Sequence, residues 1–330
     1  MEYKELGASG IKTSVITFGS WAAGGWMWGG TEQNDAVGAI HAAYDLGVTS
    51  IDTAPIYGQG LSEEIVGEAI KSLPRDKVQV LTKFGMRWDL AKGDFGFKTK
   101  DNSGHDLDVY KYAAPESIIK ECEDSLRRLG TDYIDLYQIH WPDITTPIAD
   151  TMGAVAKLIE QGKVRAVGVS NYSVEQMQEA EKVVKLASNQ VPYSMVKRDI
   201  EQDVVPYCLE HNKAILAYSP MQLGLLTGKI TPGYQFGEGD LRKNNPLFSG
   251  ENLTRINGFL DKIRPLAESK NATLSQVVLR WTIEQPGITV ALVGARNADQ
   301  ATQNAKAIDV KLSAEELDFI SKQLAQLQLA

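Results

Sequence analysis

Short apolar segments alternate along this chain with longer segments whose apolar positions recur every three or four residues. The short runs, bounded by glycine or polar residues, are typical of buried strands, and the longer pattern is typical of amphipathic helices. Strands are predicted in this way at residues 15–20, 50–52, 78–84, 133–140, 164–170, 188–190, 214–219 and 288–294. Helices are predicted at residues 34–47, 62–73, 115–130, 148–162, 173–186, around 202–211, before the eighth strand, and at 297–308.

Repeated strand–helix units of this kind predict an α/β fold in which parallel strands close into a (β/α)8 TIM barrel. The alternative is an open doubly wound sheet, which would bind a dinucleotide through G-x-G-x-x-G at its first turn. The glycine-rich segment 19–30 follows the first strand but lacks that spacing, so we interpret it as a substrate-side loop. No linker or low-complexity tract divides the chain, and we expect one domain over residues 1–330.

Two long connections interrupt the alternation, at residues 85–114 and 221–250. Both leave the C-terminal ends of predicted strands, which is the face where barrels assemble active sites. We expect them to be unstructured loops with a functional role, better ordered once a cofactor is bound. The tail 313–327 opens with Ser-Ala-Glu-Glu, a helix N-terminal signature, and we expect this helix to pack outside the barrel.

Composition narrows the class of protein. The chain is 43% hydrophobic and 23% charged, which is typical of globular proteins, and its net charge of −8 gives no reason to bind nucleic acid or an anionic membrane. The N-terminal residues contain no apolar run long enough for a signal peptide or a membrane span, so we expect a cytoplasmic protein. Cys122 and Cys208 fall in helical patterns, which favours packed thiols over a disulfide or a zinc site.

Polar residues with catalytic chemistry lie at the ends of three consecutive predicted strands. Asp52 ends the second strand with Tyr57 just beyond it, Lys83 lies on the third and His140 on the fourth. A lysine cation near a tyrosine hydroxyl favours the phenolate and can lower its pKa, while Asp52 would hold that lysine. A neutral His140 could then orient a substrate carbonyl oxygen. Each residue alone also fits a structural role, but their joint placement favours catalysis.

These residues, and the segments around them, resemble those of the aldo-keto reductase superfamily. The segments that carry the resemblance are 52–58, 82–83, 126–140, 168–172 and 224–229. The last of these, with residues 294–304, is most similar to the bacterial branch near the potassium-channel beta subunits. The resemblance implies a catalytic tetrad of Asp52, Tyr57, Lys83 and His140, with Tyr57 as the proton donor.

The same resemblance implies NADPH or NADP as cofactor, with NADH as a weaker alternative. Ser170, Asn171 and Gln190 would bind the nicotinamide carboxamide, and Tyr218 would stack on the ring. Gly224, Leu225, Thr227 and Lys229 would clamp the pyrophosphate, with Arg242 reaching the cofactor phosphates. The other cofactor residues expected near the first and seventh strands are Gly19, Ser20, Trp21, Ser219 and Pro220.

The end of the eighth strand is the second part of the expected cofactor site. Gly294, Ala295 and Arg296 begin a helix there, where free backbone N–H groups commonly bind phosphate in barrels. The resemblance implies that Arg296 binds the adenosine 2′-phosphate and that Gln300 and Asn304 contact the adenine. Met221 and Ser194 depart from the pattern of many relatives, close to the cofactor loop and away from the tetrad.

These features predict an enzyme that reduces an aldehyde or ketone with NADPH. The alternative is a nucleotide-sensing regulatory subunit with little turnover, which the presence of His140 disfavours. A metal-dependent hydrolase is excluded because the histidines form no H-x-H or H-E-x-x-H pair, and we expect no metal. The substrate pocket is expected among the tryptophans that follow strands: Trp21, Trp26, Trp28, Trp88 and Trp141. The physiological carbonyl substrate and the oligomeric state stay open.

Overall fold

A closed parallel barrel forms the centre of the molecule in the computed structural model, which describes residues 1–27, 32–237 and 240–330. Its strands neighbour one another in the order β10, β11, β12, β13, β3, β4, β5 and β9, and β9 pairs with β10 to close the ring. Their bounds in chain order are β3 (Ile16–Gly19), β4 (Ser50–Asp52), β5 (Gln79–Phe84), β9 (Ile134–Ile139), β10 (Val164–Ser170), β11 (Leu186–Pro192), β12 (Ala214–Tyr218) and β13 (Ile288–Gly294). The predicted (β/α)8 TIM barrel is therefore confirmed.

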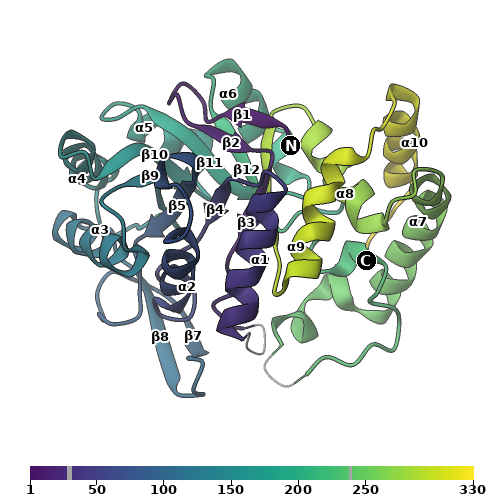
Figure 1. The fold of residues 1–330 in the computed structure, drawn as a ribbon, viewed down its shortest axis with the longest axis horizontal. Helices are drawn as coiled ribbons and strands as arrows, with labels where there is room; N and C mark the ends of the chain where they lie inside the picture. Colours follow the sequence, from purple (N-terminus) through teal and green to yellow (C-terminus); the bar gives the residue numbers. More distant parts are fainter. Residues whose placement is uncertain (28–31, 238–239) are drawn as a thin grey trace.

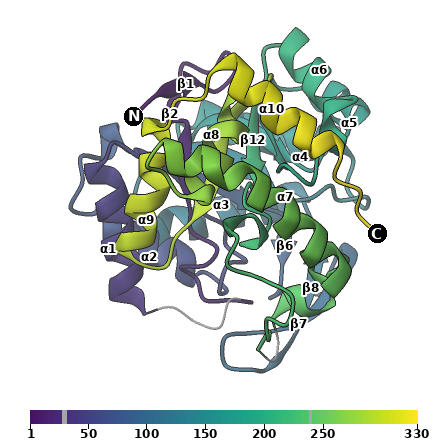
Figure 2. The ribbon, with the colours of Figure 1, turned by 90° about the vertical axis from the view of Figure 1, so that its right-hand side faces the viewer.

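Helices surround the barrel on its outer side (Figure 1). They are α1 (Gln33–Asp45), α2 (Leu61–Ile70), α3 (Pro115–Leu129), α4 (Ile148–Glu160), α5 (Val174–Ala180), α6 (Val204–Glu210), α7 (Gly250–Ser269), α8 (Leu274–Glu284), α9 (Ala298–Ala305) and α10 (Ala314–Ala325). The helix predicted at 173–186 ends earlier because Leu186 already begins β11. As predicted, Ser313 and Glu316 form a capping box at the start of α10, which packs outside the barrel against α7 (Figure 2).

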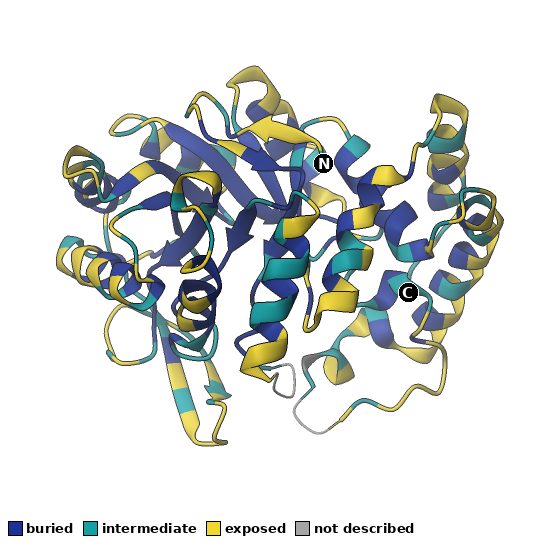
Figure 3. Cartoon of the chain, in the orientation of Figure 1, coloured by how far each residue is buried: buried dark blue, intermediate teal, exposed yellow. Residues whose placement is uncertain are grey.

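The barrel interior is divided into an apolar and a polar layer. Toward the N-terminal ends of the strands it is filled by aliphatic side chains, among them Leu81, Leu136 and Val290. A hairpin of β1 (Tyr3–Glu5) and β2 (Lys12–Ser14), which the sequence patterns did not reveal, places the fully buried Leu6 in the same cluster. Figure 3 shows the barrel strands as the most buried part of the chain. The polar layer lies toward the C-terminal ends of the strands.

The connection 85–114 contains regular structure, so the expectation of an unstructured loop was wrong. It forms a three-stranded antiparallel sheet of β6 (Met86–Arg87), β7 (Asp94–Lys100) and β8 (Asp106–Lys111). Apolar side chains alternate along β7 and β8, and Phe97 pairs with the buried Val109. This alternation gives the sheet an inner face that packs on residues beyond the barrel strands. In Figure 1 the β7–β8 hairpin projects from the end of the barrel opposite the β1–β2 hairpin.

The connection 221–250 differs, since the only helices among its described residues before α7 are short turns of 3-10 helix. These are η3 (Leu225–Thr227), η4 (Leu241–Asn244) and η5 (Pro246–Phe248). Cys122 in α3 and Cys208 in α6 are both buried free thiols, as expected, and burial raises the pKa of each to about 12. No helix among the described residues is long and apolar enough to cross a membrane.

Candidate active site

The side chains of Asp52, Lys83, Tyr57 and His140 lie together at the C-terminal end of the barrel. Lys83 is fully buried, and its Nζ donates to Asp52 Oδ1 at 2.6 Å and to the Thr53 carbonyl at 2.9 Å. The same Nζ lies 5.0 Å from the centre of the Tyr57 ring. Because β4, β5 and β9 are adjacent in the barrel, residues at their ends converge on one point.

Tyr57 and His140 face each other across the opening of the barrel. Their ring centres are 5.7 Å apart at an interplanar angle of 82°, so the contact is edge-on. The Tyr57 backbone is held in a tight turn by N–H donation to the Ala54 carbonyl. Asn171 donates from Nδ2 to the His140 carbonyl at 3.2 Å, which fixes the backbone beneath the imidazole. Within the described parts of the chain, the imidazole nitrogens of His140 make no hydrogen bond, so both are available to a ligand.

Burial and the charge of Lys83 act in opposite directions on the Tyr57 hydroxyl. Burial raises the pKa of Tyr57 above its ordinary value, and Lys83 lowers it only in part. The expectation of a lowered pKa was therefore wrong for this state of the protein, because desolvation outweighs the nearby cation. Tyr57 is a neutral phenol at neutral pH and carries a proton that it can donate.

The charge states of Lys83 and His140 follow from the same surroundings. Burial alone would lower the pKa of Lys83, but Asp52 and Tyr57 together outweigh it and the net shift of the pKa is upward. Burial, with a smaller contribution from Lys83, holds the pKa of His140 well below its ordinary value. Lys83 is thus a cation and His140 is neutral, as the sequence predicted for the histidine.

A pair of amides holds the second oxygen of Asp52. Gln190 donates from Nε2 to Asp52 Oδ2 at 2.8 Å, and Gln138 donates to the same oxygen at 3.4 Å. Sequence reasoning missed Gln138. The signal that could have identified it is its position two residues before His140, since alternate residues of a strand share one face.

The residues expected at the nicotinamide lie on β10, β11 and β12 or, for Asn171, directly after β10. Ser170 Oγ donates to the Gln190 carbonyl at 2.9 Å, and Tyr218 OH donates to Asn171 Oδ1 at 3.0 Å. Asn171 adopts a φ of 60°, a left-handed conformation that non-glycine residues rarely use. The strained backbone directs this amide between Tyr218 and His140.

The loop after β12 also has unusual backbone geometry. Ser219, Gln222 and Leu223 all have positive φ, and Thr227 Oγ1 donates to the Gly224 carbonyl at 2.6 Å. Such clusters of strained residues occur at ligand clamps. Ser194, noted in the sequence as a departure, donates to Gln222 Oε1 at 3.0 Å and so tethers this loop.

The other residues predicted for the phosphate clamp differ in their exposure and in their hydrogen bonds. The side chains of Leu225 and Pro220 are buried, and Lys229 is exposed. Arg242 donates to both oxygens of Asp240 and to the Leu223 carbonyl, so it borders the loop with its guanidinium already engaged. A cofactor phosphate would therefore have to share Arg242 with Asp240.

The segment at the end of β13 meets the end of β3, where Gly294 pairs with Gly19. Arg296 is exposed, and its backbone N–H donates to Gln300 Oε1 at 3.0 Å. Asn304 donates to the Gly294 carbonyl at 3.0 Å. Gln300 and Asn304 thus lie against residues 294–296 on one face of α9. The Ser20 side chain, also expected at the cofactor, is buried and its hydroxyl is hydrogen-bonded to that of Ser62.

An apolar cluster around Ile56, Met86 and Val109 lies beside Tyr57 and includes most of the expected tryptophans. Trp21 stacks on Tyr57 with ring centres 6.0 Å apart, and Trp88 packs against this cluster. Trp26 is only 4% exposed, donates its indole N–H to the Lys100 carbonyl and lies 6.5 Å from Trp21 between ring centres, and its place in the pocket lining stays a prediction. Trp141 is 40% exposed outside that cluster, and Trp28 lies outside the described residues.

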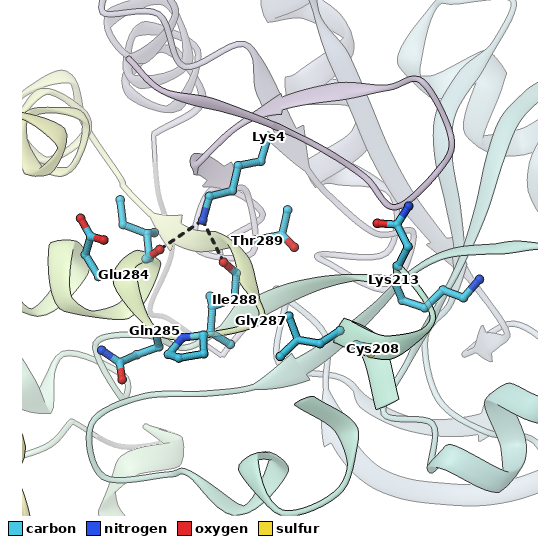
Figure 4. A pocket seen from close by; sticks show the side chains of 12 residues that line it. Lys4, Cys208, Lys213, Glu284, Gln285, Gly287, Ile288 and Thr289 are labelled. Atoms are coloured by element: carbon cyan, nitrogen blue, oxygen red, sulfur yellow. Dashed lines mark hydrogen bonds between the residues drawn. The ribbon is translucent and has the colours of Figure 1, made fainter. Parts of the chain in front are cut away.

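A separate hollow of about 380 Å³ lies at the N-terminal ends of β12 and β13 (Figure 4). Lys4 reaches into it and donates to the carbonyls of Ile283 and Ile288, while Lys213 is paired with Glu181. Both cations are therefore engaged by the chain itself. This hollow is far from Tyr57 and contributes nothing to the candidate active site.

Comparison with known proteins agrees with this geometry. The model of the aldo/keto reductase family matches residues 15–324. An aldo-keto reductase of Bacillus subtilis, YhdN, is 41% identical over 302 residues, which are 91% of this chain and 86% of that protein. An NADH-specific methylglyoxal reductase of Escherichia coli is 36% identical, with 93% of this chain and 94% of that protein covered.

Solved structures give the same result. A glycerol dehydrogenase of Gluconobacter oxydans superposes with a TM-score of 0.88 at 39% identity, covering 98% of this chain and 95% of that one. An aldo-keto reductase of Klebsiella pneumoniae in complex with NADPH gives a TM-score of 0.71 at 30% identity, with the same coverage. The narrower placement near the potassium-channel beta subunits stays a prediction. The chain belongs to the aldo/keto reductase family and is an oxidoreductase that acts on carbonyl groups with a nicotinamide cofactor.

Proposed function

We propose that this enzyme reduces a small aldehyde or ketone to the alcohol with NADPH, and that Tyr57 is the general acid. The observation that carries the proposal is the pairing of a neutral phenol, Tyr57, with a buried lysine cation behind it and a neutral, unpaired imidazole beside it. This arrangement offers a proton and a hydrogen-bond donor to one substrate oxygen, which is what carbonyl reduction requires.

The chemical roles of the chain's own residues follow from their charge states. His140 donates a hydrogen bond to the carbonyl oxygen and orients it toward Tyr57. As the carbonyl carbon gains a hydride, the C=O π electrons move to the oxygen, which takes the proton of the Tyr57 hydroxyl. The phenolate left on Tyr57 is stabilised by Lys83, which Asp52 holds in place.

The cofactor, when bound, supplies the hydride from its nicotinamide ring. The residues fit this group, because Gln190 Oε1 accepts no hydrogen bond within the described residues and lies in the same layer as Asn171 and Tyr218. Ser170, Asn171 and Gln190 would hold the carboxamide, and Tyr218 the ring. The expected residues Gly19, Trp21, Ser219, Gly224 and Ala295 would border it.

We propose NADPH as the preferred cofactor, with NADH as a weaker alternative. Arg296 supports this preference because it is an exposed cation just before α9, and the N-terminal end of a helix favours an anion such as a 2′-phosphate. The relatives include a structure with NADPH and an NADH-specific reductase, so relatives use both.

We further propose that residues 1–330 act as one barrel domain on a compact substrate. Trp21 and Trp88 give the site an apolar wall beside Tyr57. The names of relatives point to methylglyoxal and glycerol as their substrates, both of which carry short carbon chains. A regulatory, nucleotide-sensing role is disfavoured because the site keeps His140 unpaired and positioned for a substrate.

The test is a panel of short dicarbonyls, hydroxyaldehydes, aromatic aldehydes and open-chain sugars, each assayed with NADPH and with NADH. We expect turnover of at least one compact carbonyl, with a higher kcat/KM for NADPH. Tight NADPH binding without turnover of any compound would support the regulatory alternative and contradict the proposal.

A further inference from the structure

Gln138 occupies a position in the barrel that packing alone would not give to an amide. Its side chain is fully buried on β9, level with Lys83 on β5 and with Gly168 on β10. The residue two positions earlier on the same face, Leu136, belongs to the apolar layer. Burying an amide costs free energy unless its polar atoms find partners, so the partners of Gln138 account for its presence there.

Those partners are Asp52 and Gln190. Gln138 donates to Asp52 Oδ2 at 3.4 Å and accepts from Gln190 Nε2 at 3.4 Å, while Gln190 itself donates to Asp52 Oδ2 at 2.8 Å. Asp52 is therefore contacted on one oxygen by Lys83 and on the other by both amides. The side chain of Gln138 therefore links the Asp52 carboxylate to the Gln190 amide.

Gly168 makes this link possible. A Cβ atom at residue 168 would lie 3.1 Å from Gln138 Cγ and 2.5 Å from Ser188 Oγ. The second distance is shorter than real Cβ contacts, and the first is tighter than most of them. The side chain of Gln138 therefore passes over a glycine on β10 on its way from β9 toward Gln190 on β11.

We propose that Gln138 is a positioning residue that fixes Gln190 and the Asp52 carboxylate, and through Asp52 the ammonium of Lys83 behind Tyr57. This inference rests on the proposed function, since it concerns the proton transfer from Tyr57. Lys83 has a long, flexible side chain, so the place of its ammonium is set by the oxygens that accept from it. An Asp52 carboxylate free to rotate would let that cation move away from the phenol.

The second consequence concerns Gln190. Its Nε2 donates to Asp52 and Gln138, and its Oε1 accepts no hydrogen bond among the described residues, so that oxygen could accept one from a ligand. Without Gln138, the Gln190 amide would lose one of the two contacts that fix its orientation. Gln138 thus couples the acid machinery to the residue proposed to hold the carboxamide, without contacting substrate or cofactor itself.

The experiment compares Gln138→Met, which keeps length but removes the amide, with Leu136→Met as a matched control on the same strand. For Gln138→Met we expect kcat for the best aldehyde to fall roughly tenfold or more, because small displacements of catalytic groups are costly, while KM changes less than about threefold. The solvent deuterium isotope effect on kcat should rise as proton transfer becomes more rate-limiting. Leu136→Met should match the wild type in both measurements.

Two further measurements separate this inference from the proposed function. If the wild type depends on Tyr57 but Gln138→Met keeps its kcat and isotope effect, the inference is wrong and the proposed function stands. If the wild type reduces nothing, the proposed function fails, and a crystal structure of Gln138→Met decides the positioning role. Displaced Gln190 and Lys83 side chains would support it, and an unchanged Asp52 network would overturn it.

Discussion

At the scale of single residues, Lys83 controls how readily Tyr57 exchanges its proton. The pKa of Tyr57 is raised by burial and lowered by Lys83, so removing the cation leaves only the upward shift. We predict that Lys83→Met impairs reduction and moves the pH profile of alcohol oxidation to higher pH, because oxidation requires the phenolate as base. The measurement is kcat against pH in the oxidation direction. A rising limb that stays in place, or moves to lower pH, would show that Lys83 does not act on Tyr57.

Arg296 carries a second prediction at this scale. If its guanidinium pairs with the 2′-phosphate, Arg296→Ala should weaken NADPH by about 10- to 100-fold, the size of one charge-assisted contact, and leave NADH nearly unchanged. Titration of both cofactors against wild type and variant measures this. Equal losses for the two cofactors would remove Arg296 from the 2′-phosphate site.

Residue types and spacing were enough to predict which side chains meet at the site, but not their electrostatics. Asp52, Tyr57, Lys83 and His140 could be identified because each lies at the end of a predicted strand or just beyond it. The net shift of Tyr57 could not, because it depends on how far the surrounding residues exclude water. Gln138 was missed because a single glutamine in an apolar strand carries no motif, and its partners on β4 and β11 are distant in sequence.

At the scale of elements, the junction of β5, β6 and α3 contains a buried carboxyl group. Glu121 accepts from the Gly85 N–H and the Ser117 hydroxyl at 2.9 Å each, and lies 3.7 Å from Arg87. Burial raises its pKa from 4.5 to about 7 in the folded protein. Since the folded-state pKa is the higher one, Glu121 contributes stability below pH 4.5 that is lost as the pH rises through about 7.

We predict that Glu121→Gln reduces this loss. Between pH 5 and 8 the unfolding free energy of the variant should fall by about 1–3 kcal/mol less than that of the wild type, because its side chain cannot ionise. Urea unfolding of both proteins at the two pH values measures the difference. Equal pH dependence would mean that the carboxyl group is ionised in the fold at little cost.

The alternation of short strand segments with helical patterns predicted the barrel strands, including the three-residue β4. The β1–β2 hairpin was missed because its short strands consist mostly of polar residues and no helical pattern separates them. The sheet within 85–114 was missed although polar and apolar residues alternate along β8, because the glycines and charges of the segment favoured a loop and the buried face depends on contacts such as Trp26 with Phe97. Pairings between distant segments of this kind are not visible in a local pattern.

At the scale of the whole molecule, the two ends of the barrel have separate tasks. The N-terminal end is sealed by the β1–β2 hairpin over an apolar layer, and the C-terminal end carries the polar layer and the candidate active site. This separation predicts that substitutions at the N-terminal end lower the unfolding free energy and have little effect on kcat.

Leu6→Ala tests that separation. Leu6 is fully buried in the apolar layer, so its truncation should lower the unfolding free energy by about 2–5 kcal/mol through lost burial and a residual cavity. NADPH affinity and kcat at 25 °C should stay near the wild-type values in the fraction that is folded. Unfolding in denaturant and steady-state kinetics on the same preparation give both quantities. A large fall in kcat with unchanged stability would contradict the separation.

The central claim is that Tyr57 supplies the proton, and Tyr57→Phe tests it most directly. The substitution keeps the ring that stacks on Trp21 and removes only the hydroxyl. Single-turnover reduction of the best aldehyde by the NADPH complex should slow by roughly 10² or more, while NADPH affinity stays within a few-fold. Reduction at a near wild-type rate would mean that the proton comes from another group and that Tyr57 is not the acid.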